Sequence, residues 1–154
     1  MTLIRLLGPE DWQVFRTVRL AALKEAPYAF GSKYEDEVGA SETSWRGRIS
    51  GWTRFAAEVD GQVAGLVGSG PGELAGTAAL TSLWVDPRFR GRGLGTALIE
   101  AVVEWARGQD LSQVLLWVAE GNKHAEALYQ RNGFVRTGVV IDQPLREFEM
   151  SKRI

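Results

Sequence analysis

LWVDPRFRGRGLGTAL, residues 83–98, is the stretch of sequence that decides the fold. Its first residues end an apolar strand at Val85, and its glycine-rich part leads into an amphipathic helix that continues to Gly108. A strand followed by a glycine-rich turn and a helix predicts an anion-binding site at the start of that helix. The first N–H groups of a helix have no partners within it, and the helix dipole favours negative charge there.

The composition of this loop supports a phosphate ligand. Glycines at 91, 93 and 95 allow the backbone to approach an anion closely. Arginines at 88, 90 and 92 add positive charge, and the guanidinium group suits bidentate contacts with phosphate. A Walker A loop is excluded because Gly-Lys occurs nowhere in the chain. A dinucleotide fingerprint also fails, because its third small residue would be Thr96 or Leu98.

The composition of the whole chain limits the remaining classes of function. A length of 154 residues, 45% hydrophobic and 24% charged, is typical of one globular domain, which we expect to span residues 1–154. A net charge of −1 gives no sign of a nucleic-acid binder. The chain has no cysteine, which excludes disulfides, thiolate metal sites and a cysteine acyl-enzyme, and we expect no metal. No apolar run spans a bilayer and no signal peptide is evident, so we expect a cytoplasmic protein without membrane contact.

Hydrophobic periodicity and turn residues predict the order of elements along the chain. Strands are expected at residues 3–7, 53–59, 62–67, 78–85, 113–119, 134–138 and 146–150. Helices are expected at residues 9–25, 41–49, 95–108 and 122–133, with a loop over 26–39 and a glycine-rich connection over 68–76. Asp60-Gly61 is a strong signal for a two-residue hairpin turn. This order predicts an α/β fold with a mixed sheet.

Two motifs resemble those of the GNAT superfamily, the Gcn5-related N-acetyltransferases. The first is Arg90-x-x-Gly93-x-Gly95, and the second runs from Asn122 to Phe134 as N-x-x-A-x-x-L-Y-x-x-x-G-F. The resemblance covers residues 76–138, the acetyl-CoA-binding core that it implies. It also implies a mixed, mostly antiparallel twisted sheet flanked by helices, with a central parallel strand pair around the coenzyme A loop.

The activity implied by the resemblance is transfer of an acetyl group from acetyl-CoA to a primary amine, by direct attack in a ternary complex. The alternative is a catalytically inactive acetyl-CoA-binding sensor or assembly module. The acceptor is expected to be a small-molecule amine or a protein amine. Because dimers are common in the family, a homodimer with the C-terminal strand at its interface is a further expectation.

The resemblance implies roles for particular residues of the acetyl-CoA site. Tyr129 is the expected general acid for the departing sulfur. Leu83 and Val85 are expected to contact the pantetheine arm through their backbones, and Asn122 either contacts that arm or only caps its helix. The residues expected to wrap the pyrophosphate are Arg90, Gly91, Arg92, Gly93, Leu94, Gly95 and Thr96.

The acceptor side is less defined. Residues 1–52 are expected to form it, with aromatic residues as candidate walls and acids that would attract a cationic amine; these are Tyr28, Phe30, Tyr34, Trp45, Glu35, Asp36 and Glu37. Each of these residues could equally be an ordinary core or surface residue. Trp84 and Trp117 are expected to be packing residues, with a role in shaping the acceptor pocket as the alternative for either one. The general base stays open among Glu37, Glu58, Asp86 and Glu120, and ordered water is a further carrier for the proton.

Overall fold

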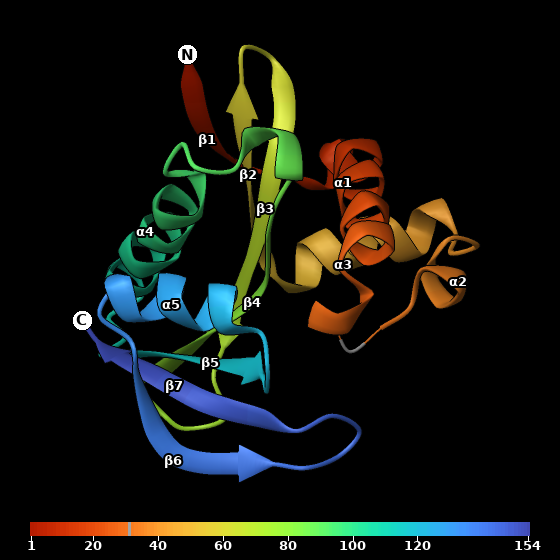
Figure 1. The fold of residues 1–154 in the computed structure, drawn as a ribbon. Helices are drawn as coiled ribbons and strands as arrows, with labels where there is room; N and C mark the ends of the chain where they lie inside the picture. The colour runs from red at the N-terminus through yellow and green to blue at the C-terminus, as the bar shows by residue number, and fades with distance from the viewer. Residues whose placement is uncertain (31) are drawn as a thin grey trace.

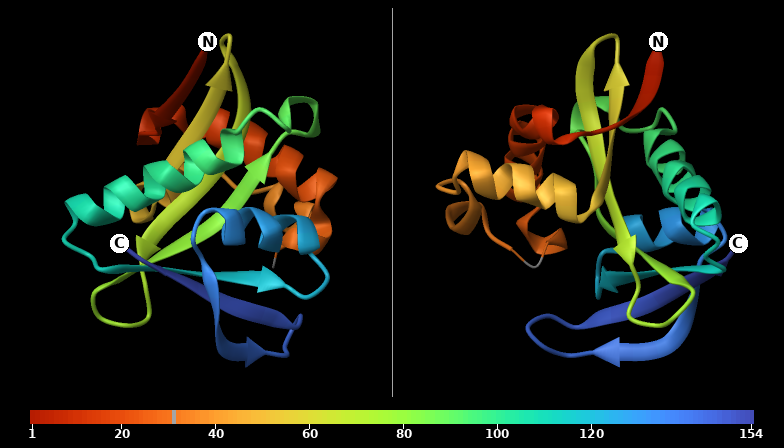
Figure 2. Two further views of the ribbon diagram at one scale, coloured as in Figure 1. Left: turned by 60° about the vertical axis from the view of Figure 1, so that its left-hand side comes forward. Right: turned by 180° about the vertical axis from the view of Figure 1, so that it is seen from behind.

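The computed structural model describes residues 1–30 and 32–154, with the side chain of Tyr28 outside the described part. Seven strands form one sheet in the order β1-β2-β3-β4-β5-β7-β6. Helices α1, α2 and α3 cover one face of the sheet, and α4 and α5 cover the other (Figures 1 and 2). All strand pairs are antiparallel except β4 and β5, which confirms the expected mixed sheet with one parallel pair.

The strands are β1 (Thr2–Leu6), β2 (Thr53–Val59), β3 (Gln62–Pro71), β4 (Thr77–Val85), β5 (Gln113–Ala119), β6 (Val135–Ile141) and β7 (Glu147–Arg153). The helices are α1 (Trp12–Glu25), α2 (Tyr34–Glu37), α3 (Glu42–Gly51), α4 (Leu94–Gly108) and α5 (Lys123–Arg131). Short 3₁₀ turns lie at Pro9–Asp11, Pro27–Ala29 and Pro87–Phe89. No helix within the described ranges is both long and apolar enough to cross a bilayer.

Local sequence signals explain most of these boundaries. Ser41 accepts a hydrogen bond from the Ser44 amide at 3.1 Å and so caps α3, as expected. Asp60 and Gly61 both have positive φ, at 49° and 83°, which is the backbone of the two-residue turn predicted between β2 and β3. The apolar side of α4 packs on the sheet and is buried, as its spacing predicts.

Two segments that the sequence predicted to be loops contain regular secondary structure. Residues 26–39 contain the Pro27–Ala29 turn and the short helix α2. Strand β3 continues to Pro71, so its last residues are not a connection. The glycines in this part of β3 leave room for larger side chains: a Cβ on Gly70 would lie 2.5 Å from Trp52 Cε3. Tertiary packing, which local propensity does not contain, therefore extends the strand.

The strands β4 and β5 separate soon after they pair. They are in register only from Thr77–Gln113 to Ala79–Leu115. Farther along, β4 carries a bulge, because the register with β3 shifts opposite Leu66–Gly68 and Ser82 adopts a φ of 56°. The ribbons of β4 and β5 diverge beyond this point (Figure 1). The divergence leaves one edge of β4 without a strand partner and opens the middle of the sheet.

Candidate active site

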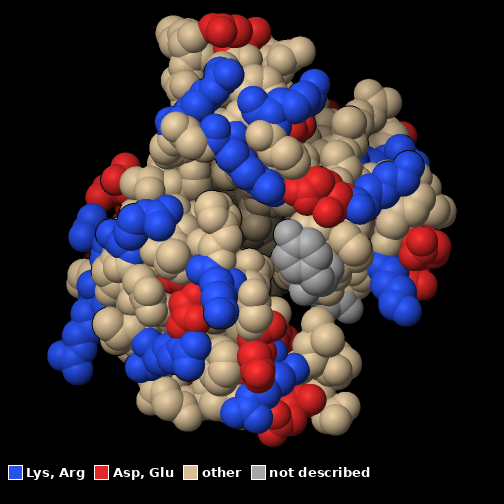
Figure 3. Space-filling model, viewed as in Figure 1, with Lys and Arg blue, Asp and Glu red and all other residues tan. Residues whose placement is uncertain are grey.

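A cleft of about 450 Å³ lies where the end of β4, the loop before α4 and the helix α5 meet. Figure 3 shows a hollow near the middle of this face, with basic atoms gathered above it over the segment that joins β4 to α4. The residues that line the cleft are Ala26, Ala29, Leu83, Trp84, Val85, Arg90, Gly91, Gly93, Leu94, Gly95, Thr96, Asn122, His124, Ala125, Leu128, Tyr129 and Arg131. Of the eleven site residues predicted from the sequence, Arg92 alone is absent from this lining.

The backbone before α4 forms an anion cradle. Gly91 and Gly93 both have a φ of 79°, in the left-handed region that favours glycine. Gly93 is the residue before α4, and no side chain in the described part of the chain caps this end of the helix. The N–H groups of the first turn, including those of Gly95 and Thr96, therefore lack partners within the helix and border the cleft. Such a helix start binds phosphate or carboxylate groups.

Gly95 has a different structural role from Gly91 and Gly93. A Cβ at this position would lie 2.8 Å from Cδ2 of Leu128 on α5. The missing side chain allows the start of α4 to approach α5 closely. Asn132 stabilises the same contact between α4 and α5, because its side-chain amide donates a hydrogen bond to the Thr96 hydroxyl at 3.1 Å. The close approach of the two helices sets the width of the cleft.

The arginine side chains of the loop before α4 stabilise its conformation. Arg90 donates from Nε to the Val85 carbonyl at 3.0 Å, and its guanidinium pairs with Glu25 at the end of α1. The Arg92 guanidinium lies 5.3 Å from the centre of the Phe89 ring. Arg88 pairs with Asp86 at 2.9 Å, and this contact holds the pKa of Asp86 below its usual range. The loop thus presents its backbone to the cleft, while these side chains hold the loop in shape.

Tyr129 is the one phenol among the described residues that line the cleft. Its side chain is buried among apolar residues, with 7% of the residue exposed. Burial raises the pKa of the Tyr129 hydroxyl well above its ordinary value. The phenol therefore stays protonated at neutral pH, which suits a group that donates a proton.

Asn122 caps α5, because its side-chain oxygen accepts from the Ala125 amide at 3.4 Å, and it also borders the cleft. Sequence reasoning did not select His124, Leu128 and Arg131, which share the same wall. Their spacing of four and three residues places them on one helical face, and this signal could have identified them. Trp84 is buried as expected, but it too lines the cleft, and its Nε1 has no hydrogen-bond acceptor among the described residues.

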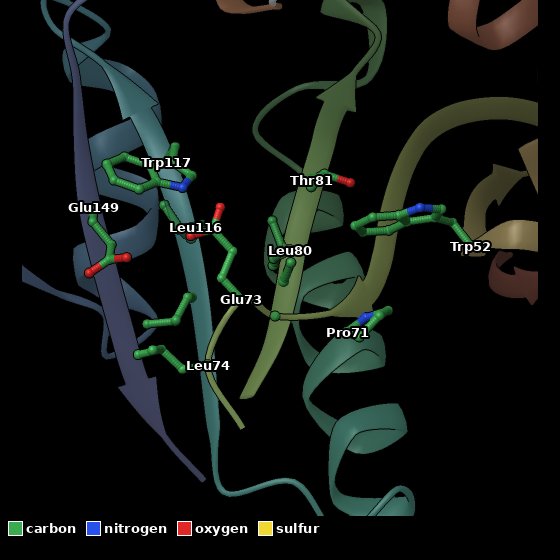
Figure 4. A pocket seen from close by; sticks show the side chains of 12 residues that line it. Trp52, Pro71, Glu73, Leu74, Leu80, Thr81, Leu116, Trp117 and Glu149 are labelled. Atoms are coloured by element: carbon green, nitrogen blue, oxygen red, sulfur yellow. The ribbon is translucent and has the colours of Figure 1, made fainter. Parts of the chain in front are cut away.

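A second cavity of about 300 Å³ lies where β4 and β5 diverge. Thr81 and Trp117 line it from strand positions that alternate with core residues packed beneath α4, so these two side chains face the α1–α3 side of the sheet. Figure 4 shows Trp117 and Glu149 on one wall, Trp52 on the opposite wall, and Leu80 and Thr81 on β4 between them. Glu73 and Glu149 are its two acidic residues. Of this lining, sequence reasoning suggested Trp117 alone, as a residue that could shape the acceptor pocket, and it missed the rest.

The acceptor-side residues that the sequence suggested lie elsewhere. Trp45 is completely buried, with its ring edge against Phe15 at 5.5 Å between centroids. Phe30 lies beneath the Arg19 guanidinium and Tyr34 beneath the Lys24 ammonium. None of these three aromatics lines either cavity, and the side chain of Tyr28 lies outside the described part. Their packing roles follow from α1 and α3, which cover them.

The four candidate bases are held by arginines. Glu37 pairs with Arg19 and Arg48, Glu58 with Arg5, Asp86 with Arg88, and Glu120 with Arg146. Burial alone would raise the pKa of Glu37, but its contacts with Arg19 and Arg48 outweigh burial and lower that pKa. None of the four carboxylates lines either cavity.

Comparison with known proteins identifies the family. Residues 17–134 match the model of the acetyltransferase (GNAT) family. The chain belongs to this family. A related sequence is an uncharacterized N-acetyltransferase of Methanocaldococcus jannaschii, 38% identical over 91 residues, which are 56% of this chain and 40% of that protein. The N-acetylaspartate synthetase of Danio rerio is 35% identical over 91 residues, covering 59% of this GNAT chain and 32% of the synthetase. The chain thus spans well under half the length of these curated relatives.

The GNAT fold is also clear from solved structures. The PaiA N-acetyltransferase of Thermoplasma acidophilum, solved in complex with coenzyme A, superposes with a TM-score of 0.81 at 19% identity, covering 100% of this chain and 99% of that one. An acetyltransferase of the GNAT family from Streptococcus pneumoniae superposes with a TM-score of 0.80 at 22% identity over the whole of both chains. At these identities the likeness concerns the fold alone.

Proposed function

We propose that this GNAT chain transfers the acetyl group of acetyl-CoA to a primary amine. The observation that carries the proposal is the cleft, which joins the unpartnered N–H groups at the start of α4 to the protonated phenol of Tyr129. An elongated ligand with an anionic end and a reactive end matches these two features. The name of the Thermoplasma protein, an N-acetyltransferase solved with coenzyme A, supports the same ligand.

The residues of the cleft fit acetyl-CoA, which would supply an activated acetyl group as a thioester. The amides of Gly93, Gly95 and Thr96 would hold its pyrophosphate. Leu83 and Val85 lie on the part of β4 that has lost β5 as a neighbour, so the backbone there can pair with an extended amide-bearing arm. The unpartnered Nε1 of Trp84 offers a further donor along the same wall.

Catalysis would need few groups from the protein. The nitrogen of the neutral amine attacks the carbonyl carbon, a C–N bond forms and the C–S bond breaks. Tyr129 donates its phenolic proton to the departing sulfur, the amine gives up a proton to solvent, and the phenolate then regains a proton from solvent. A cysteine acyl-enzyme is excluded because the chain has no cysteine, so direct attack is the simpler route.

The second cavity is the proposed acceptor site. It opens on the α1–α3 side of the sheet, at the gap between β4 and β5, whereas the cleft follows β4 farther toward α4. An amine in this cavity would approach the thioester through the gap. The names of relatives include both small-molecule and ribosomal-protein acetyltransferases. A cavity of about 300 Å³ favours a small molecule or one side chain.

A homodimer through β6 is part of the proposal. The C-terminal strand β7, which the sequence suggested for the interface, lies inside the sheet of the described residues, between β5 and β6, and has no free edge. Strand β6 lies at the sheet edge, and Val135, Val139, Val140 and Ile141 are all more than a third exposed. Exposed apolar edge strands pair readily with another chain. Light scattering should report a dimer for the natural chain and a monomer for Val139→Lys. A natural chain that is monomeric at high micromolar concentration would remove the dimer from the proposal.

The activity can be tested by measuring the coenzyme A thiol released with a panel of primary amines. The assay has no background from the protein, because the chain contains no thiol. Amine-dependent release that falls in Tyr129→Phe, while coenzyme A binding stays unchanged, supports the enzyme. Binding of acetyl-CoA without release for any amine would instead favour a sensor or assembly module.

A further inference from the structure

A cluster of three arginines around one carboxylate lies on the α1–α3 side of the sheet. Glu37 accepts from Arg19 at 3.1 Å through each oxygen and from Arg48 at 2.7 Å. These groups are largely buried: the side chains of Glu37 and Arg19 are 6% and 13% exposed. Arg54, on β2, is the third cation. The cluster therefore holds three positive charges and one negative charge.

Arg54 lacks the partner that a buried arginine normally has. Within residues 1–30 and 32–154, its Nε is buried with no hydrogen-bond acceptor, and no carboxylate forms an ion pair with its guanidinium. Its neighbours are the Phe15 ring, 4.9 Å away, and the other two arginines. Burial, with repulsion from Arg19 and Arg48, lowers the pKa of Arg54 to about 10. A partly buried guanidinium with a buried, unpartnered Nε is stabilised by a nearby anion.

Arg54 is not part of the lining of the second cavity, but it lies close to one residue of that lining. Gly68 on β3 pairs with Arg54 on one side and with Thr81 on the other. A Cβ on Gly68 would lie 2.6 Å from Arg54 Nη1 and 2.9 Å from Thr81 Oγ1, so the absent side chain lets these two groups approach each other. Thr81 lines the cavity. The Arg54 guanidinium thus lies next to Thr81, which separates it from the proposed acceptor.

The cluster also touches the bulge that separates the two cavities along β4. Arg19 donates from Nη1 to the Ser82 hydroxyl at 3.1 Å. Ser82 lies between Thr81, which lines the second cavity, and Leu83, which lines the cleft. Excess positive charge therefore lies beside the point where the acceptor amine would meet the thioester.

We propose that the acceptor is a small amine of the amino-acid class, which also carries a carboxylate. Arg54 binds this carboxylate, and Arg19 and Arg48 lie next to Arg54 and add positive charge. The inference rests on the proposed function. Trp52 and Trp117 would flank an apolar portion of the acceptor, as the walls in Figure 4 indicate. Binding of the carboxylate supplies the negative charge that the cluster lacks.

Matched acceptors test this assignment. Acetyl transfer at saturating acetyl-CoA would be measured for phenylalanine, tryptophan, leucine and lysine, and for the amines that lack only their carboxylate: phenethylamine, tryptamine, isoamylamine and cadaverine. Phenylalaninamide keeps the shape of phenylalanine without the charge. Its amine is less basic, so a preference for phenylalanine over the amide cannot arise from amine ionisation.

At least one carboxylate-bearing amine should have a kcat/KM about tenfold or more above its matched amine, mainly through KM. In Arg54→Gln this ratio should fall toward one, because the carboxylate-bearing amine loses its contact with Arg54 and the matched amine has no such contact to lose. Arg107→Gln, at the exposed end of α4, should keep the ratio. The inference is overturned if no carboxylate-bearing amine is preferred, or if the ratio survives in Arg54→Gln.

If Arg54→Gln fails to fold, the preference of the natural chain for phenylalanine over phenylalaninamide still tests the carboxylate assignment, and Arg54→Met tests the role of Arg54. Acetylation only of amines that lack a carboxylate would overturn the carboxylate assignment and leave the proposed function intact. Failure of acetyl-CoA to bind would remove the proposed function itself. If acetyl-CoA binds but no amine reacts, thermal stabilisation of the coenzyme A complex by phenylalanine but not by phenethylamine supports the assignment. Equal effects of the two would reject it.

Discussion

Tyr129 lies edge-on to Phe134, with ring centroids 6.0 Å apart and planes inclined at 62°. Both rings are buried, so the phenol has little rotational freedom. Because Tyr129 also lines the cleft, the packing of Phe134 fixes where its hydroxyl is presented. A proton donor held in this way needs no rearrangement during catalysis.

Replacement of Tyr129 by Phe removes the hydroxyl and keeps the ring packed against Phe134. We expect kcat to fall about 100-fold, the lower range for loss of a general acid. The dissociation constant of coenzyme A should stay unchanged, because the ring and not the hydroxyl shapes the cleft. Steady-state kinetics with calorimetric titration separate the two effects. Full activity of Tyr129→Phe would exclude the role assigned to the phenol.

Gly93→Ala tests the backbone of the anion cradle. With φ at 79°, an alanine there costs about 1–2 kcal/mol in the required conformation. We expect coenzyme A to bind about tenfold more weakly, since the amides before α4 would lose their alignment. Gly108→Ala is the control: the last residue of α4 has open space around it, and alanine there should leave binding unaltered. Equal affinity of Gly93→Ala and Gly108→Ala for coenzyme A would contradict the role of this backbone in binding the anion.

Glu37→Gln tests the charge balance of the buried cluster. Loss of the carboxylate leaves Arg19 and Arg48 uncompensated, which should cost about 3 kcal/mol, or roughly 6–12 °C in melting temperature. The pKa of Glu37 is lowered in the folded state, so its stabilisation is present above the unfolded pKa and is lost as the pH falls through the folded one. The difference from the natural chain should therefore be full at pH 7 and shrink below about pH 4.

Glu42→Gln provides the matched control for Glu37→Gln. Glu42 pairs with Arg46 one helical turn away on α3, where its side chain is 55% exposed. An exposed pair of this kind contributes about 0.5 kcal/mol or less. Equal melting temperatures for the two variants would mean that the buried cluster contributes nothing to stability.

Arg54→Met should make the protein more stable while it removes the preference for carboxylate-bearing acceptors. Removal of a buried cation without a partner should add about 1 kcal/mol, or roughly 2–4 °C in melting temperature. Burial and repulsion from Arg19 and Arg48 lower the pKa of Arg54, which shows that its charged form is held at a cost in the folded state. Thermal melts at pH 7 measure the gain in stability, and the matched acceptors measure the loss of preference. A lower melting temperature at pH 7 would show that Arg54 stabilises the fold.

The parts of the site that the sequence predicted depend on local patterns. The glycine positions, the spacing of apolar residues in α4 and the motif around Tyr129 are each contained within a short segment. The cap formed by Asn122 and the turn at Asp60-Gly61 are local for the same reason. Such features follow from backbone conformation and helix periodicity, so one sequence was enough to place them.

The acceptor side depends on contacts between distant segments. Glu37 and Arg54 belong to α2 and β2, and only the packing of α1 and α3 on the sheet brings their charges together. The second cavity exists because β4 and β5 pair over three residues and then separate, which neither strand pattern reveals. Trp45 and Phe30 were candidate walls by composition, but burial of α1 and α3 makes them core residues.

The most direct test of the acetyl-CoA site is a thermal melt of the purified protein with and without acetyl-CoA. A ligand at about 100 times its dissociation constant adds about 2.7 kcal/mol to the free energy of unfolding. For a chain of this length we predict a rise in melting temperature of roughly 5–10 °C, with none for ATP or NAD. No rise at any concentration of acetyl-CoA would contradict the account, and the glycine cradle before α4 would then serve another ligand.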